Sequence, residues 1–147
     1  MNCMKLESMK RKLLIAIIAI VVAIIWIQSI LPSEISSQES GWFTEHIVKP
    51  AMEWLGLEAI SELVVRKLAH MTEYCLLGLL VTMLWKKKPV LSFQLCFLVA
   101  FIDESIQLLS NRGSEVLDIW IDISGAILGI GLSLIIDIVR KPKDTER

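Results

Sequence analysis

The stretch "LLIAIIAIVVAIIWIQSIL", residues 13–31, decides the class of fold. It carries no charge, and it is about as long as the roughly 20 apolar residues that a helix needs to cross a bilayer. The basic residues 10–12 precede it. A signal peptide also has a basic start, but its apolar core is usually only about 7–15 residues long and is followed by a cleavage site of the A-x-A type. We therefore expect a retained membrane anchor.

The composition of the chain agrees with a membrane protein. Hydrophobic residues make up 54% of its 147 residues and its mean hydropathy is +0.62, whereas an ordinary soluble domain is about 45–50% apolar. The net charge of -1 comes without a basic face, so we expect no nucleic-acid partner. Cys3, Cys75 and Cys96 have the spacing of neither a disulfide framework nor a zinc site.

Three further apolar runs follow the first, at residues 68–85, 90–109 and 118–139. Lysines end the second run, and Arg140 with Lys141 closes the last one. No internal repeat divides the chain. The sequence therefore predicts an all-α fold, a four-helix transmembrane bundle that forms one membrane domain over residues 1–147.

The basic residues predict the orientation of this bundle, because cytoplasmic loops collect Lys and Arg. If both termini are cytoplasmic, most basic side chains lie on the cytoplasmic side. The exceptions are Lys49, Arg66, Lys67 and Arg112. We therefore expect a multi-pass protein of the cell membrane with cytoplasmic N- and C-termini.

The loop between the first two spans, residues 32–66, then lies outside. Within it, "GWFTEHIVKPAMEWLGLEAISELVV" spaces large apolar residues among acids as one or two short amphipathic helices would. Tryptophan favours the headgroup level of a membrane. We expect these helices to lie in the outer interface or to cap the bundle, with a solvated loop as the alternative.

Polar side chains gather toward the outer ends of the later spans. At about 1.5 Å of rise per residue, Tyr74 and His70 lie roughly 18 and 24 Å from the cytoplasmic lysines, and Asp122 lies roughly 27 Å from Arg140. The same count places Asp103, Glu104, Gln107 and Asp118 at similar depths. Because the hydrocarbon core is about 30 Å thick, all of them fall in its outer third or at its surface.

The acids are too costly to face lipid. An acid near the middle of a span costs about 2.5–3.5 kcal/mol, whereas each large aliphatic residue returns only about 0.3–0.6 kcal/mol. Asp103 and Glu104 could therefore cancel most of the apolar gain of their span unless they lie near the interface, are protonated or are paired. Helical spacing places the polar residues of each span on one face. We predict a shared polar pocket that opens to the outside.

Gly125 and Gly129 form a small-xxx-small pattern in the last span. Such patterns let a second helix approach closely. We expect packing within the chain, and the alternative is a homodimer through the same two glycines.

Several motifs together resemble the VanZ-like family of bacterial membrane proteins. They are "RKLAHMTEYCLLG" at residues 66–78, "DESIQ" at 103–107, "NRGS" around Arg112 and "DIWIDISGAILG" at 118–129, with "SSQESG" at 36–41 fitting the outer loop. The resemblance implies a small helical membrane protein of the bacterial cell envelope, and the family's named member is associated with teicoplanin resistance. Ile106 stands where the family often has histidine, which counts against a mechanism that needs two histidines.

The leading hypothesis is that the pocket binds the headgroup or sugar of an anionic lipid or a lipid-linked cell-wall component. Basic side chains would pair with a phosphate while carboxylates bind hydroxyls. The candidate ligand-binding residues are Arg66, Lys67, His70, Glu73, Tyr74, Asp103, Glu104, Gln107, Arg112, Asp118 and Asp122.

Other functions use the same residues. In a membrane enzyme for lipid headgroups or glycolipids, Asp103, Glu104 and His70 would be catalytic. In a purely structural protein, the charges would only pair helices. We expect no cofactor and no metal, because the His and acidic residues lack a specific ligand spacing. Four spans without a repeat also argue against a transporter.

Overall fold

The computed structural model describes residues 2–31, 33–56, 58, 60–85, 88–110 and 116–140. Every regular element within these ranges is a helix, so the predicted all-α fold is confirmed. The elements are α1 (Asn2–Ile30), α2 (Ser33–Phe43), the π-helical turn η1 (Thr44–Val48), α3 (Lys49–Trp54), α4 (Glu62–Leu84), α5 (Pro89–Leu109) and α6 (Val116–Arg140).

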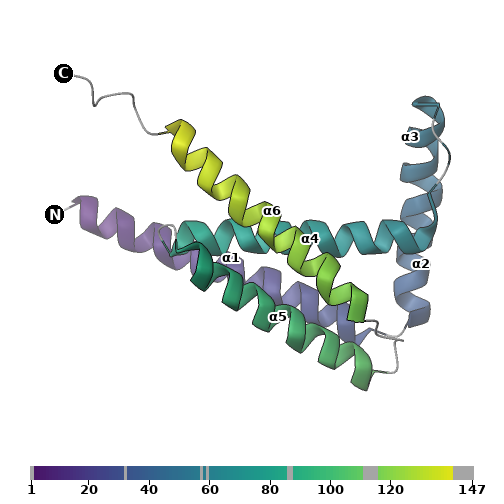
Figure 1. Ribbon diagram of the computed structural model, residues 1–147, viewed down its shortest axis with the longest axis horizontal. Helices are drawn as coiled ribbons and strands as arrows, with labels where there is room; N and C mark the ends of the chain where they lie inside the picture. Colours follow the sequence, from purple (N-terminus) through teal and green to yellow (C-terminus); the bar gives the residue numbers. More distant parts are fainter. Residues whose placement is uncertain are drawn as a thin grey trace.

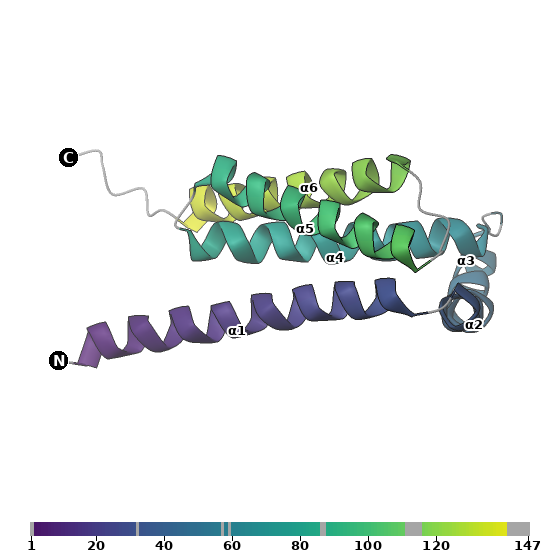
Figure 2. The same ribbon diagram turned by 90° about the horizontal axis from the view of Figure 1, so that it is seen from below.

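The four long helices, α1, α4, α5 and α6, run lengthwise in alternating directions (Figures 1 and 2). As a result, α1 begins and α6 ends at the same end of the molecule, and the turn between α4 and α5 lies there too (Figure 1). We call this the terminal end, and the other the arm end. Helix α4 packs most extensively on α6, and it also contacts α1, α5 and α2.

Three helices in the described part of the chain are long and apolar enough to cross a membrane, namely α1 over Met4–Ile30, α5 over Pro89–Leu109 and α6 over Leu117–Arg140. Helix α4 has 23 residues but does not meet the same criterion. Its first half carries Arg66, Lys67, His70 and Glu73 among its apolar residues. The four-helix transmembrane arrangement therefore stays a prediction at α4.

Helix α1 is longer than the sequence predicts, because it begins at Asn2 instead of near residue 13. The added residues include Met, Leu, Glu, Lys and Arg without Gly or Pro, and all five are good helix formers. The basic residues 10–12 therefore indicate where the apolar span begins, but the helix itself begins earlier, at Asn2. The helix ends at Ile30, just before Leu31-Pro32, where the proline disfavours a helical residue ahead of it.

Helices α2 and α3, joined by η1, form an arm that stands nearly perpendicular to α4 (Figure 1). It occupies the loop in which the sequence predicts short amphipathic helices. Several large apolar side chains of the arm and the turn after it are exposed: Ile35, Trp42, Phe43, Ile47, Trp54 and Leu55. Gly56 then takes the left-handed conformation, with φ of 69°, that commonly ends a helix.

Helix α4 begins at Glu62, inside the predicted outer loop. Ser61 caps it, since its side chain accepts a hydrogen bond from the Val64 amide at 3.4 Å. The charged residues at the start of α4 are thus helical and share faces with the polar residues that follow them.

Close packing of α4 on α6 depends on glycine. A Cβ atom at Gly129 would lie 1.8 Å from the Cys75 carbonyl oxygen, and one at Gly125 would lie 2.1 Å from that of Met71. The reciprocal contact is at Gly78 of α4, where an added Cβ atom would lie 2.4 Å from the Ala126 carbonyl oxygen. The packing within the chain that the glycine spacing predicts is confirmed, and Gly78 adds to it from the other helix.

The apolar core lies between the four long helices. Its buried members are Ile18 and Ile25 of α1, Tyr74, Leu77 and Val81 of α4, Cys96, Val99 and Ala100 of α5, and Ala126 of α6. Cys75 and Cys96 are free thiols. The core ends toward the arm at Tyr74, where polar side chains replace apolar ones.

Candidate functional site

The carboxylate of Asp103 is fully buried, and side chains of two helices hold it. Ser29 of α1 donates a hydrogen bond to its Oδ1. Gln107, one turn further along α5, donates from Nε2 to its Oδ2 at 3.2 Å and also lies 3.2 Å from the Ser29 hydroxyl. A buried carboxylate is tolerated when such donors satisfy it. This contact attaches the end of α1 to α5.

Glu73 of α4 forms a second contact to α1. Its Oε1 accepts a hydrogen bond of 3.0 Å from Gln28 Nε2. On the other side, His70 Nδ1 lies 3.8 Å from Glu73 Oε2. Since His70 and Glu73 are three residues apart, they share one face of α4.

Lys67 of α4 reaches the last long helix. Its Nζ lies 2.7 Å from Asp118 Oδ1, and the two side chains are 25% and 27% exposed. This ion pair lies in the first turn of α6, on the N-terminal side of the glycine contacts. It therefore ties the same helix pair at a second point.

Three more polar groups of these helices are buried: Tyr74, Glu104 and Asp122 are 0%, 9% and 4% exposed. Asp122 is within electrostatic range of Asp103, Glu104 and Asp118. In the described part of the chain, the Tyr74 hydroxyl has no hydrogen-bond partner. Like charges repel in a buried site, so a bound proton would stabilise these carboxylates. We call Asp103, Glu104 and Asp122 the carboxylate cluster.

A groove of about 610 Å³ opens beside the cluster, between the end of α1, the arm and the start of α4. We call it the arm groove. Its polar lining comes from Gln28, Ser40, Arg66, His70, Thr72 and Glu73. Leu31, Phe43, Val48, Ile60, Val65 and Leu68 supply most of its apolar lining. The groove is therefore amphipathic, with its titratable groups on α4.

Arg66 is the only arginine that lines the groove among the residues the structure describes. It is partly buried, and no ion pair within the described ranges involves it. Guanidinium groups favour phosphate and carboxylate because they offer several donors in a planar fork. Arg66 is thus a positive group in the groove that has no protein counter-ion in this part of the chain.

Comparison with protein families gives one match: the chain matches the VanZ/LLP1 family over residues 14–137. It belongs to that family. No curated protein and no solved structure matches it. Together with three membrane-like apolar helices, this membership makes the chain a VanZ-like multi-pass membrane protein, and the resemblance seen in its motifs is confirmed.

The VanZ-like motifs occupy different parts of this region. The first motif supplies Arg66, His70 and Glu73 to the arm groove, and Lys67 to the ion pair with Asp118. Asp103 and Glu104, the DESIQ acids, lie in the buried carboxylate cluster. They do not line the groove. The structure thus separates what the sequence predicts as one pocket into a groove and a cluster, and Arg112 lies outside the described residues.

Sequence reasoning missed the contribution of α1. Gln28 and Ser29 bind Glu73 and Asp103, yet the first span was expected to act as an anchor. The signal is the uncharged pair "QS" near the end of that run. Ser40 and Thr72 were also missed and line the groove, and the Ser40 hydroxyl donates a hydrogen bond of 2.8 Å to Glu62.

In the described part of the chain, no group of three His, Cys, Asp or Glu side chains is placed to hold a metal ion. Neutral side chains donate hydrogen bonds to both carboxylates, Ser29 and Gln107 to Asp103 and Gln28 to Glu73. Chemically, the region can bind an anion through Arg66, bind hydroxyls through Glu73 and His70, and accept or release protons through the cluster.

Proposed function

We propose that this VanZ-like protein binds, in its arm groove, the headgroup of an anionic lipid or of a lipid-linked cell-wall component. The observation that carries the proposal is Arg66, a partly buried cation without an ion pair in the described chain, on the wall of an amphipathic groove. An amphipathic ligand with a phosphate near its apolar chain matches both halves of that lining.

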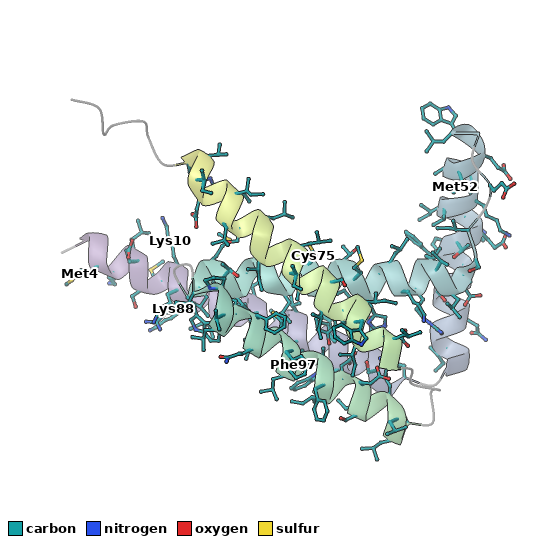
Figure 3. The ribbon with its side chains drawn as sticks, in the orientation of Figure 1. Met4, Lys10, Met52, Cys75, Lys88 and Phe97 are labelled. Carbon is teal, nitrogen blue, oxygen red and sulfur yellow. The ribbon has the colours of Figure 1, made fainter. Side chains whose placement is uncertain are left out.

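The proposal includes a four-helix transmembrane bundle with the groove on the outer side. Helix α4 crosses with α1, α5 and α6 because it packs against all three, and its polar side chains contact those of α1 and α6. Lys10 and Lys88 lie at the terminal end (Figure 3), which supports a cytoplasmic location for both termini. The arm end, with its exposed Trp42 and Trp54, then faces the outer headgroups.

Each part of the groove has a role in this proposal. The Arg66 guanidinium binds a phosphate through charge-assisted hydrogen bonds. Glu73 and His70 bind headgroup or sugar hydroxyls, and Gln28 holds Glu73 in place. Leu31, Phe43 and Val48 contact the first part of the acyl or prenyl chain.

A binding measurement on the purified protein tests the proposal. Delipidated protein in detergent is titrated with phosphatidylglycerol, a polyprenyl diphosphate lipid and phosphatidylcholine, and adducts are counted by native mass spectrometry. Because a charge-assisted hydrogen bond contributes about 1.5–3 kcal/mol, Arg66→Gln should weaken binding of one anionic lipid about tenfold or more. Lys49→Gln is the matched control, since Lys49 is a cation of the arm that pairs with Glu45 and does not line the groove. Equal affinity of the Arg66→Gln and wild-type proteins would contradict the proposal.

The proposed ligand class connects the groove to glycopeptide susceptibility. If the bound lipid carries a cell-wall precursor, expression of the protein changes the supply or exposure of the glycopeptide target. Cells that express the wild type should then differ in teicoplanin susceptibility from cells that express Arg66→Gln at the same membrane level. Equal susceptibility would limit the function to lipid binding.

A membrane enzyme acting on a lipid headgroup or glycolipid is the second candidate. The observation that favours it is the carboxylate cluster beside the buried Tyr74 hydroxyl, because neighbouring acids can divide acid and base roles. Asp103→Asn/Glu104→Gln should then abolish a lipid species that wild-type expression produces, whereas Glu53→Gln in the exposed part of α3 should not. Identical lipid profiles would remove this candidate.

A structural protein is the third candidate. The observation that favours it is that three contacts join different helix pairs: Gln28 with Glu73, Ser29 with Asp103, and Lys67 with Asp118. It predicts loss of stability in variants of these residues without any change in lipid selectivity. The titration above separates it from the leading proposal.

A further inference from the structure

A second cavity lies at the terminal end, far along the long helices from the arm groove. It has a volume of about 800 Å³ and lies between the first turns of α1, the end of α4 and the start of α5. We call it the terminal cavity. It shares no lining residue with the arm groove.

The charged lining of this cavity is mostly basic. It contains the cations Lys10, Arg11 and Lys88 and one acid, Glu7. Figure 3 shows Lys10 on α1 and Lys88 at the turn before α5, both at this end of the molecule. Within the described ranges, none of the three cations forms an ion pair. The cavity therefore has an excess of positive charge that the described protein groups leave uncompensated.

Each helix passes from a cation to an apolar residue as it leaves the terminal end. On α1, Lys10 is followed one turn later by Leu14, and at the start of α5, Lys88 is followed by Leu91. The two helices run in the same direction (Figure 1), and Figure 3 shows Lys10 and Lys88 at the same end of the molecule. Trp85 also lines the cavity, and tryptophan favours the boundary between headgroups and hydrocarbon.

We propose that the terminal cavity binds the phosphate headgroup of an anionic phospholipid from the leaflet at that end. Lys10, Arg11 and Lys88 bind the phosphate, and Leu14, Leu91 and Trp85 contact the start of the acyl chains. Basic pockets between membrane helices on the cytoplasmic side bind anionic headgroups in this way. The inference is independent of the proposed function, because it uses a different cavity at the opposite end.

The test compares two charge-matched variants of the full chain. Lys10→Gln/Lys88→Gln removes two cations from the cavity. Lys5→Gln/Arg140→Gln removes two exposed cations of α1 and α6 that do not line it. Delipidated protein is titrated with phosphatidylglycerol and with phosphatidylcholine by native mass spectrometry, and helical content is checked by circular dichroism. A cation near an anionic surface contributes about 1 kcal/mol, or about fivefold in affinity.

We expect the cavity variant to bind one phosphatidylglycerol about 25-fold more weakly, with less than a threefold change in the control. Arg66→Gln should keep this adduct, which separates the terminal cavity from the arm groove. Equal weakening in the two double variants would overturn the proposal, as would equal binding of both lipids by the wild type. Displacement of the lipid by glycerol phosphate at a similar concentration would also overturn it, because a free phosphate would then be sufficient.

Discussion

Gly129 and Gly131 on α6 differ strongly in the space that a side chain would have at each position. A Cβ at Gly129 would meet the backbone of Cys75 and Leu79, at distances of 1.8 to 2.8 Å, whereas one at Gly131 would meet nothing within 4 Å. Gly129→Ala should therefore lower the free energy of unfolding by about 1–3 kcal/mol, because α4 and α6 must move apart. Gly131→Ala should leave it unchanged or raise it by up to about 1 kcal/mol, since alanine favours helix. Thermal unfolding in detergent measures both, and equal midpoints would contradict the packing.

Ser29 tests how the buried Asp103 is stabilised. Ser29→Ala removes a donor from a fully buried carboxylate, so it should destabilise the protein by about 1–3 kcal/mol. Ser105→Ala is the control, because the Ser105 hydroxyl donates to the carbonyl of Phe101 on its own helix. Denaturant unfolding should show a loss for Ser29→Ala alone. A similar loss in both variants would mean that the contact to Asp103 adds nothing.

At this scale, the sequence predicts which polar groups lie near one another better than it predicts their hydrogen-bond partners. Counting along the spans predicts that Tyr74, Asp103 and Asp122 lie together, and the structure places them within electrostatic range of one another. Their depth in a membrane stays a prediction. Counting does not identify Ser29 and Gln107 as the groups that satisfy Asp103, because a neutral donor in an apolar run costs little and leaves a weak signal. Charge balance predicts a cation beside Asp103, but hydrogen-bond donors of suitable geometry are enough to satisfy a buried carboxylate.

At the scale of elements, the ion pair between Lys67 and Asp118 can be tested for its contribution to the packing of α4 on α6. Lys67 and Asp118 are partly exposed, so their ion pair should contribute about 0.5–1 kcal/mol beyond the two separate substitutions. A double-mutant cycle with Lys67→Met and Asp118→Asn, followed by unfolding, measures this coupling. Strictly additive effects would show that the ion pair does not hold the helices.

The arm should lie at the level of the outer headgroups. Trp54 is 87% exposed and Trp42 is 60% exposed, on an arm set nearly across α4. In a variant that keeps only Trp54, with the other four tryptophans changed to Phe, lipids that carry a quencher near the headgroup should quench its fluorescence more than lipids with a deep quencher. Quenching by neither would place the arm in water, as the solvated-loop alternative requires.

The sequence predicts elements better than their orientations. Amphipathic spacing over residues 41–65 predicts helix where η1 and α3 lie, whereas most of α2 precedes that stretch. Glycine spacing identifies the α4–α6 contact. The hydrogen bond from Ser40 to Glu62 joins the arm to α4, and no periodic pattern in the sequence predicts it. The π-helical turn at Thr44–Val48 likewise has no sequence signature.

At the scale of the whole molecule, the arm groove and the terminal cavity lie at opposite ends of one set of long helices. The arm groove carries Arg66 with His70 and Glu73, and the terminal cavity carries three cations and one acid. The distribution of charge along the sequence predicts which helix ends lie on the same side, because most basic residues cluster at one set of span ends. It cannot predict the cavities, since each depends on how far α1 lies from its neighbours.

The central claim is that the arm groove holds an anionic headgroup through Arg66. The most direct test reconstitutes the protein in vesicles that contain a photoreactive phosphatidylglycerol with its reactive group close to the headgroup, and maps the labelled peptides by mass spectrometry. We predict labelling of the groove wall around Phe43 and Leu68 in the wild type and in Lys49→Gln, and a loss of about tenfold in Arg66→Gln. Labelling that avoids this wall, or that stays the same in Arg66→Gln, would contradict the account.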